Sequence, residues 1–526
     1  MRDGHASPGW VAVSRMKGSR REPGDPTGAI EWSSMGARGE GRPEPRAELR
    51  SGVGPARSTD EALEGTARAG SVEGRGWREG NSLEKARDRT LSRVALLPHL
   101  QRVHDAARHD KRAQFTALLH HVDVAALARA FRRLKRNASA GIDGVTVMTY
   151  EQELERNLQA LCEQVHTGRY RPFPVRRVFI PKSDGGQRPL GVPALEDKVV
   201  QGAVAEVLNA IYEVDFLGFS YGFRPRRNPH QALTALHTAM MTQQVNWVLD
   251  ADIRKFFDSV DHGWLMRMVA HRIADPRVLR LIAQWLRAGV MEQGEWHETT
   301  VGTPQGAGIS PLLANIYLHY VLDLWVQRWR RRTARGRVSI VRYADDFVMG
   351  FQTGPDARQM RADLQERLQH FGLQLHEEKT RVIEFGRLPA LAQKQRGEHR
   401  LGTFAFLGLT HYCGWTRDGR FIVKRKTQRQ RMTVKLKTLN EEAKRRRHEP
   451  VRDQHQWWCQ VLRGHYAYFG LPSNFRALQA FSHHVRRIWF RALYRRSQRR
   501  LTWEGFEALL NRFPLPRPHI THPRVA

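Results

Sequence analysis

The sequence predicts an α+β fold in which an antiparallel sheet carries acidic residues and a helical region follows it. Three observations support this prediction. The run from Val338 to Gly350 has two segments rich in β-branched and aromatic residues around a short polar tip, as in a hairpin. A second strand-like run ends at Asp252, and past Arg425 the composition changes to long basic helices.

Composition and charge restrict the class of protein. The 526 residues suffice for roughly two to four domains with sizeable cores. The formal net charge is +33, so a long polyanion is the expected partner, and binding to a membrane surface is the rival interpretation. No run approaches the roughly 20 apolar residues of a spanning helix, and no apolar signal segment opens the chain. Three cysteines without paired spacing favour neither disulfides nor a zinc ribbon, which predicts a reducing, cytoplasmic setting.

Residues 1–90 are dense in Gly, Arg, Pro, Ser and Glu and show no apolar periodicity. Such a segment buries too little apolar surface to offset its ordering entropy, so we predict a disordered basic extension. Solvated filler is the simplest interpretation, and an RNA-binding arm is the alternative. An overlong reading frame is a third one, because Met16 and Met35 are other possible starts.

Helical periodicity begins near Leu91 and is interrupted by Gly141 and Gly144. Two extended segments come next, and Ser183-Asp-Gly-Gly186 joins them as a turn. We therefore expect a second hairpin with Lys182 and Arg188 at a mobile tip, which could also be only a solvated basic hairpin.

The middle of the chain alternates helices with loops. A helical period starts at Leu195, and Asn228 and Pro229 are typical of a helix cap and a first helical residue. Between these helices, Arg224 is the residue that we expect to contact nucleic acid. After the hairpin of Val338 to Gly350, Met360 to Phe371 has the period of another helix, stopped by a glycine.

The segment Gly302-Thr-Pro-Gln-Gly306 precedes a further helix, predicted to start with Ser310 as N-cap and Pro311 at its first position. Its glycines allow the backbone to approach a ligand closely, and Gln305 can hydrogen-bond to a nucleotide or template. The arginines at the end of this helix suit both the helix dipole and a phosphate backbone.

Two adjacent carboxylates, Asp345 and Asp346, occupy the tip of the first hairpin. Because they repel each other, a turn that holds both is favourable mainly when a divalent cation neutralises them, although an ordinary solvated turn is the alternative. Asp252 at the end of a strand opposite the hairpin would complete a site for two metal ions roughly 3.5–4 Å apart. Nucleotidyl transfer requires such a site.

These motifs resemble a known family. Tyr343-Ala344-Asp345-Asp346 together with Asp252-Ile-Arg-Lys-Phe-Phe-Asp258 is similar to a reverse transcriptase, specifically one encoded by a group II intron. The resemblance runs from about Leu91 nearly to the C-terminus, with the central motifs in family order. Leu462-Arg-Gly-His-Tyr-Ala-Tyr-Phe-Gly470 resembles the maturase, or thumb, motif. No cysteine follows it, which predicts the kind that lacks a C-terminal HNH endonuclease domain.

The resemblance implies a right-hand polymerase with fingers, a palm that contains the antiparallel sheet, and an α-helical thumb that doubles as maturase domain. The implied boundaries are a low-complexity extension at 1–90, an N-terminal segment with fingers at 91–194, the palm with the remaining fingers at 195–425, and the thumb/maturase (X) domain at 426–526. In this last region, cations alternate with aromatic residues. These could stack on RNA bases or pack a helical core.

The resemblance also implies the activity, RNA-directed DNA polymerisation by a nucleotidyltransferase, and roles for single residues. Asp252, Asp345 and Asp346 would place two Mg²⁺ ions. The substrate-binding residues implied are Lys182 and Arg188 over the triphosphate, Phe257 against the sugar, Gln305 on the nucleotide or template, and Lys379 beside the carboxylates.

The partners implied are group II intron RNA, an RNA template, a DNA primer or target, and deoxynucleoside triphosphates. The protein would then assist splicing and intron mobility. Two alternatives stay open. One is a group II-like reverse transcriptase that serves DNA repair or phage defence without an intron, and the other is a splicing cofactor that only binds RNA.

Overall fold

The computed structural model describes residues 13–14, 97–181, 186–292, 294–303, 306–397, 401–496 and 501–522. The predictions for the extension at 1–90, beyond residues 13–14, and for Lys182 and Gln305 fall outside the described residues. Among the described helices, none has the length and the apolar character that crossing a membrane requires.

Helices dominate the first part of the described chain. The long helix α6 (Leu195–Asp215) packs against α2 and α3, and its apolar face joins the larger of two hydrophobic cores. The elements before α6 are β1 (Val13–Ser14), α2 (Pro98–His109), β2 (Gln114–Phe115), α3 (Val124–Arg132), α4 (Val147–Glu151) and α5 (Leu154–Thr167). β1 pairs antiparallel with β2.

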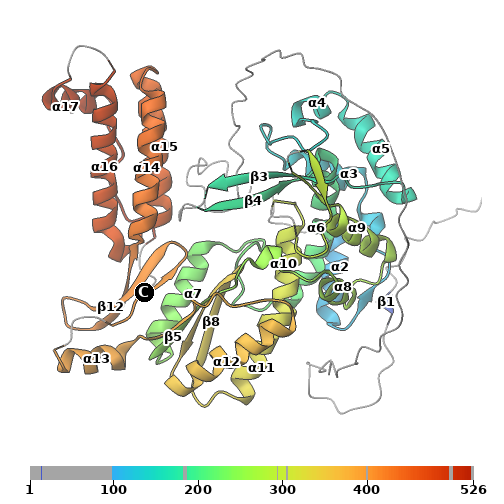
Figure 1. The fold of residues 1–526 in the computed structure, drawn as a ribbon, viewed down its shortest axis with the longest axis horizontal. Helices are drawn as coiled ribbons and strands as arrows, with labels where there is room; N and C mark the ends of the chain where they lie inside the picture. The colour runs from blue at the N-terminus through green and yellow to red at the C-terminus, as the bar shows by residue number, and fades with distance from the viewer. Residues whose placement is uncertain are drawn as a thin grey trace, which may run out of the picture. The chain divides into compact units, whose positions relative to one another are not determined.

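A four-stranded antiparallel sheet bears the acidic residues, as predicted (Figure 1). Its order is β10-β5-β9-β8, built from β5 (Trp247–Asp252), β8 (Val338–Tyr343), β9 (Asp346–Phe351) and β10 (Arg381–Glu384). β8 and β9 form the predicted hairpin, and the register of β5 on β9 places Asp252 directly opposite Asp346.

Alternating side chains of this sheet enter two different cores. Leu249 and Met349 pack with α12 (Gly354–His370) in the first core, whereas Val248 and Val348 pack with α7 (Pro229–Thr242) in the second. α7 starts with the predicted cap at Asn228, and α12 is followed by Gly372 in a left-handed conformation. The sheet is therefore held from both faces, which makes its strand ends a rigid platform.

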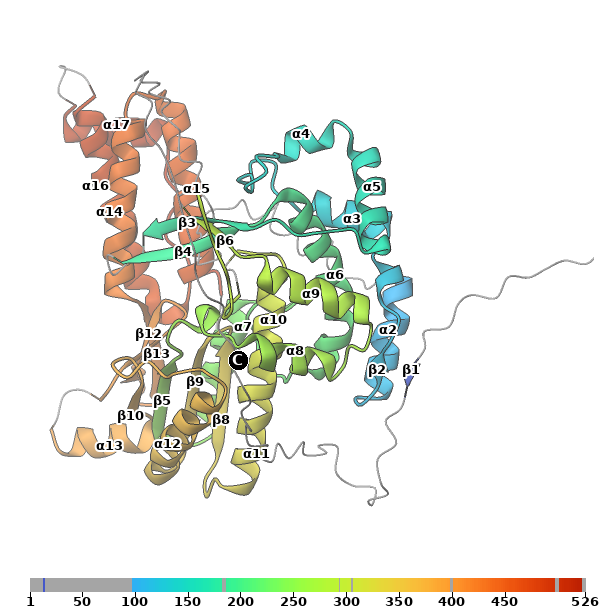
Figure 2. The same ribbon diagram turned by 45° about the vertical axis from the view of Figure 1, so that its right-hand side comes forward.

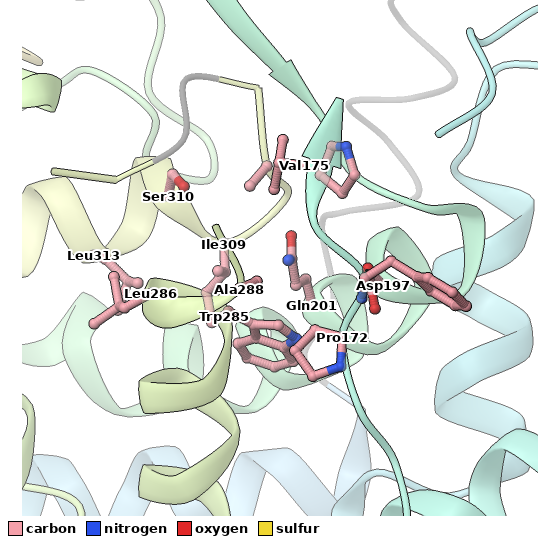
Figure 3. Close-up of a pocket in the computed structure, with 13 residues that line it drawn as sticks. Pro172, Val175, Asp197, Gln201, Trp285, Leu286, Ala288, Ile309, Ser310 and Leu313 are labelled. Atoms are coloured by element: carbon pink, nitrogen blue, oxygen red, sulfur yellow. The ribbon is translucent and has the colours of Figure 1, made fainter. Parts of the chain in front are cut away.

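A second sheet, of order β4-β3-β6-β7, contains the other predicted hairpin. Its strands are β3 (Val175–Pro181), β4 (Gln187–Val192), β6 (Val290–Glu292) and β7 (Glu295–His297), with Arg188 opposite Ile180. A cavity at the base of this hairpin is lined by Asp197, Gln201 and Trp285 among others (Figure 3). Its volume of about 10 Å³ has room for one water molecule, so it holds no substrate.

The helix after Gly306 begins one residue earlier than predicted. α10 (Ser310–Leu318) has Ile309 as its flanking residue, and no side chain caps it. The Ser310 cap is therefore wrong, because Ile309 already has right-handed helical angles and Ser310 lies inside the helix. A π-helical turn, His319–Asp323, then leads into α11 (Leu324–Arg332).

The C-terminal part combines a three-stranded antiparallel sheet with long helices that run side by side (Figures 1 and 2). The elements are β11 (Phe404–Phe406), β12 (Leu409–Trp415), β13 (Phe421–Thr427), α14 (Arg429–Arg446), α15 (Val451–Phe469), α16 (Phe475–Tyr494) and α17 (Trp503–Arg512). The remaining helices of the described chain are α8 (His262–Ala270), α9 (Pro276–Arg287) and α13 (Arg387–Gln395).

Most aromatic residues of these long helices form a core. On α15 and α16, Trp458, Tyr466, Phe469 and Trp489 are buried, whereas Phe475 and Tyr494 are exposed. The buried aromatic residues therefore pack a helical core, which is one of the two interpretations of the sequence. They cannot stack on RNA bases. They lie at core spacing on facing helices, where burying a large ring stabilises more than exposing it.

Candidate active site

A pocket of about 800 Å³ opens where the strands of the acidic sheet end. Asp250 and Asp252 of β5, Asp346 of β9 and Asp345 of the connecting turn line it. Such a volume lies within the range of small-ligand sites and is large enough for a nucleotide.

The carboxylates crowd one wall of the pocket. Asp252 ends β5 and Asp346 starts β9 in the paired register, while Asp345 lies in the two-residue turn of the hairpin. Burial raises the pKa of Asp345, and the charge of Asp252 raises it further. Burial also raises the pKa of Asp346 well above its ordinary value, with contributions from Asp345, Asp250 and Asp252. This wall concentrates negative charge in a partly dehydrated place.

Two basic side chains balance part of this charge. The Lys379 ammonium lies 3.0 Å from a carboxylate oxygen of Asp252. Arg381 of β10 faces Asp250 across the sheet, with 3.4 Å between guanidinium and carboxylate. Burial nevertheless raises the pKa of Asp250 to about 6, although Arg381 lowers it. In the described structure, Lys379 thus lies where the sequence analysis expects it, beside the carboxylates.

The donor set fits a hard divalent cation. Carboxylate oxygens are the ligands that Mg²⁺ prefers, and a cation would relieve the repulsion among Asp252, Asp345 and Asp346. Among the described residues, however, no three acidic, histidine or cysteine side chains already converge as a metal cluster. Because Asp252 is paired with Lys379, a cation would compete with this lysine for the carboxylate.

Phe257 forms another part of the pocket wall. It lies in a short 3₁₀ turn, Phe256–Asp258, in which Phe256 is core and Phe257 reaches the pocket beside Phe223, with 6.4 Å between ring centroids. The backbone N–H of Thr303 donates to the Phe257 carbonyl over 2.7 Å. Gly302 has φ of 92°, and a Cβ there would lie 3.0 Å from the same carbonyl. The glycine loop therefore supports the backbone of Phe257 from behind.

Comparison with known proteins gives the family. Residues 180–411 match the family described as "Reverse transcriptase (RNA-dependent DNA polymerase)". The chain is 37% identical over 256 residues to Protein YkfC of Escherichia coli, a match that covers 43% of this chain and 67% of that protein. It is 38% identical over 200 residues to Group II intron-encoded protein LtrA of Lactococcus lactis, covering 37% of this chain and 33% of that protein. The chain belongs to the group II intron-encoded reverse transcriptase family.

A third relative of this reverse transcriptase is the Putative COX1/OXI3 intron 1 protein of Saccharomyces cerevisiae. It is 28% identical over 322 residues, which cover 52% of this chain and 38% of that protein. The match therefore spans about a third of LtrA and of the yeast protein, but two thirds of YkfC.

The prediction that Arg224 contacts nucleic acid is wrong for this reverse transcriptase. Arg224, expected to contact nucleic acid, is buried and makes all its contacts inside the protein. Its guanidinium bonds to the Glu213 carboxylate at 3.0 Å and donates to the carbonyls of Leu217 and Ser220. A guanidinium with these partners is not available to a phosphate.

Several residues that line the reverse transcriptase pocket were missed or not assigned to it. Arg381, Arg431 of α14 and Phe223 all lie in its wall, together with Tyr468 of α15, which the sequence analysis places only in the maturase motif. No local pattern marks them, because they approach the aspartates only through the tertiary fold. The pairing of β10 with β5 would have identified Arg381.

Proposed function

We propose that this protein is an RNA-directed DNA polymerase that uses two Mg²⁺ ions, held by Asp252, Asp345 and Asp346. The observation that carries the proposal is the register of β5 on β9. This register pairs Asp252 with Asp346 beside the turn that contains Asp345. Arg188 and Lys379 line the same pocket. When bound, the ions would activate the attacking hydroxyl and neutralise charge on the leaving pyrophosphate.

Roles for the chain's own residues follow from their positions. Arg188 on β4 would bind the triphosphate, and we assign the same role to Lys182, because cations there offset the charge of the transferred group. Lys379 would hold Asp252 in place until a cation binds, as their 3.0 Å contact suggests. We assign the fingers to 91–194, the palm to 195–425 and the thumb/maturase domain to 426–526.

The direct test is primer extension on an RNA template with deoxynucleotides and increasing Mg²⁺. We expect extension that requires both the template and the cation. Binding of RNA without any extension would instead support the splicing cofactor that only binds RNA.

Phe257 gives a prediction about sugar selection. An aromatic ring at the pocket wall would exclude a 2′-hydroxyl by volume, so Phe257→Ala should raise ribonucleotide relative to deoxynucleotide incorporation roughly 10- to 100-fold, the range for a lost steric contact. The ratio of the two values of kcat/KM is the quantity to measure. Phe257→Tyr, which keeps the ring, is the matched control and should leave the ratio near that of the wild type. An unchanged ratio in the alanine variant would show that another residue faces the sugar.

We also propose that the C-terminal helices bind group II intron RNA and assist its splicing. The support is the family and the basic exposed surface, since Lys437, Arg463 and Arg487 all lie exposed on α14, α15 and α16. Arg486, the neighbour of Arg487 in the chain, is a poor probe of RNA binding because its guanidinium is paired with the Glu507 carboxylate. The alternative is a group II-like reverse transcriptase that serves DNA repair or phage defence without an intron. A folded group II ribozyme in the flanking DNA would exclude this alternative.

Changing Lys437, Arg463 and Arg487 to alanine tests the RNA proposal. Non-specific binding should fall with a shallower salt slope, by about one unit for each lost phosphate contact. If these helices recognise the intron, affinity for cognate intron RNA should fall more than affinity for an unrelated duplex, and splicing at physiological Mg²⁺ should slow. Competition binding at two salt concentrations measures both losses, and equal losses would remove this surface from intron recognition.

A further inference from the structure

The turn that carries Asp345 has an unfavourable backbone. Ala344, directly before Asp345, has φ of 59°, which is the left-handed region that residues with a Cβ rarely adopt. Such a conformation persists only where its surroundings enforce it. Neighbouring groups must therefore hold Ala344 in this conformation.

A buried arginine reaches this turn from behind. Arg342, in β8, has no exposed surface, and its Nη1 donates to the Ala344 carbonyl over 3.0 Å. Its backbone is also fixed, because its N–H donates to the Phe219 carbonyl and its carbonyl accepts from Tyr221, each over 2.9 Å. The side chain thus donates to the turn from a residue whose backbone is held by two hydrogen bonds.

Two further residues orient the guanidinium. The Asp323 carboxylate, fully buried, accepts from Nε over 2.7 Å and also from Nη2. Asn315 accepts from Nη1 over 3.0 Å and donates to the Gly222 carbonyl over 2.8 Å. Three acceptors in different directions need the planar fork of arginine, since an ammonium group cannot reach them all.

The π-helical turn explains why Asp323 faces this site. Asp323 is the last residue of the turn His319–Asp323, which joins α10 to α11. A π turn inserts one residue into a helix, so the side chains after it are rotated relative to a regular α-helix. Gly222 closes the remaining side, because a Cβ there would lie 2.2 Å from the Ala344 nitrogen. No side chain fits between this glycine and the turn.

We propose that Arg342, oriented by Asp323 and Asn315, is a positioning residue that holds the left-handed turn at Ala344 and so sets the place of Asp345 in the pocket. This inference rests on the proposed function of Asp345. Arg342 itself touches neither substrate nor cation. Its contribution is to the geometry of the turn, on which the affinity for a divalent cation and the rate of nucleotide addition depend.

Arg342→Lys is the main test, because it keeps the buried charge beside Asp323 but loses the fork. We expect kcat for nucleotide addition to fall roughly 10- to 100-fold, as for a catalytic group displaced by about 1 Å, with primer–template affinity unchanged. Binding of Mn²⁺ to the protein alone, measured by calorimetry, should weaken as well. Hydrogen exchange of the peptide that spans residues 343–346 should become faster.

Arg272→Lys is the matched control. Arg272 is also a buried arginine near a carboxylate, that of Asp215, and it donates to the carbonyls of Asp110 and Ala113, but none of these partners belongs to the segments that hold Arg342 or the aspartate turn. This variant should leave hydrogen exchange at 343–346 and Mn²⁺ affinity unchanged. Equal effects of the two lysine variants would overturn the proposal, because a general loss of stability would then explain both.

A second variant keeps the test valid if Arg342→Lys does not fold. Arg342→Met with Asp323→Leu removes both charges and fills the space, so no unpaired buried charge is left. It should fold and show the same faster exchange and weaker Mn²⁺ binding. If the wild type extends no primer, the proposed function fails, whereas unchanged exchange at 343–346 in a folded variant overturns the positioning role.

Discussion

Asp345→Ala is expected to abolish Mg²⁺-dependent DNA synthesis while RNA binding survives. The substitution removes a proposed metal ligand from a wall whose other carboxylates, Asp252 and Asp346, cannot replace it from their strand positions. A bound metal ion contributes several kcal/mol of charge stabilisation, so the rate should fall by at least about 10³-fold. RNA affinity should not fall, because it depends on basic side chains that contact phosphates.

Primer extension and RNA affinity should be measured on the same preparation of this variant. The matched control is Asp418→Ala, which removes an exposed aspartate in the connection between β12 and β13. This control should extend primers like the wild type. Substantial residual extension by Asp345→Ala would contradict the assignment of Asp345 as a ligand.

Arg272→Met is expected to destabilise the folded protein strongly. Arg272 is 1% exposed, lies 3.1 Å from the Asp215 carboxylate and donates to the carbonyls of Asp110 and Ala113 over 3.0 Å. It therefore ties α2 and the β2 region to α6. Methionine fills the space but leaves Asp215 charged and unpaired, which should lower the free energy of unfolding by about 3–5 kcal/mol.

Urea denaturation of both proteins measures this loss, and the pH dependence identifies its cause. Burial already raises the pKa of Asp215 to about 6, although Arg272 lowers it. Without Arg272 this pKa should rise further, and a protonated carboxyl needs no cationic partner. The deficit should therefore shrink as the pH falls toward about 6, and its electrostatic part should be absent below that pH. Arg272→Met combined with Asp215→Asn, which leaves no unpaired buried charge, should lose less stability, and a deficit independent of pH would point to lost packing instead.

The sequence analysis found the local elements of the site. Extended segments joined by short polar turns predicted both hairpins, β8–β9 and β3–β4, and cap residues predicted the start of α7 at Asn228. The strand ending at Asp252 and the aspartates at the hairpin tip led to the family that comparison then supported. Each of these features depends on interactions between residues that are near neighbours in the chain, so a short window of sequence contains the information.

Only the tertiary structure decided how side chains far apart in the chain are used. Nothing in the sequence around Arg224 and Arg342 distinguishes a buried arginine from one that binds phosphate, because burial depends on acceptors supplied by other elements. The carboxylate of Asp323, 19 residues before Arg342, becomes its partner through a π turn that no periodicity predicts. The buried aromatic residues of α15 and α16 became core for the same reason. Burying a large apolar ring against a facing helix is favourable wherever the fold provides one, and the fold is determined by the whole chain.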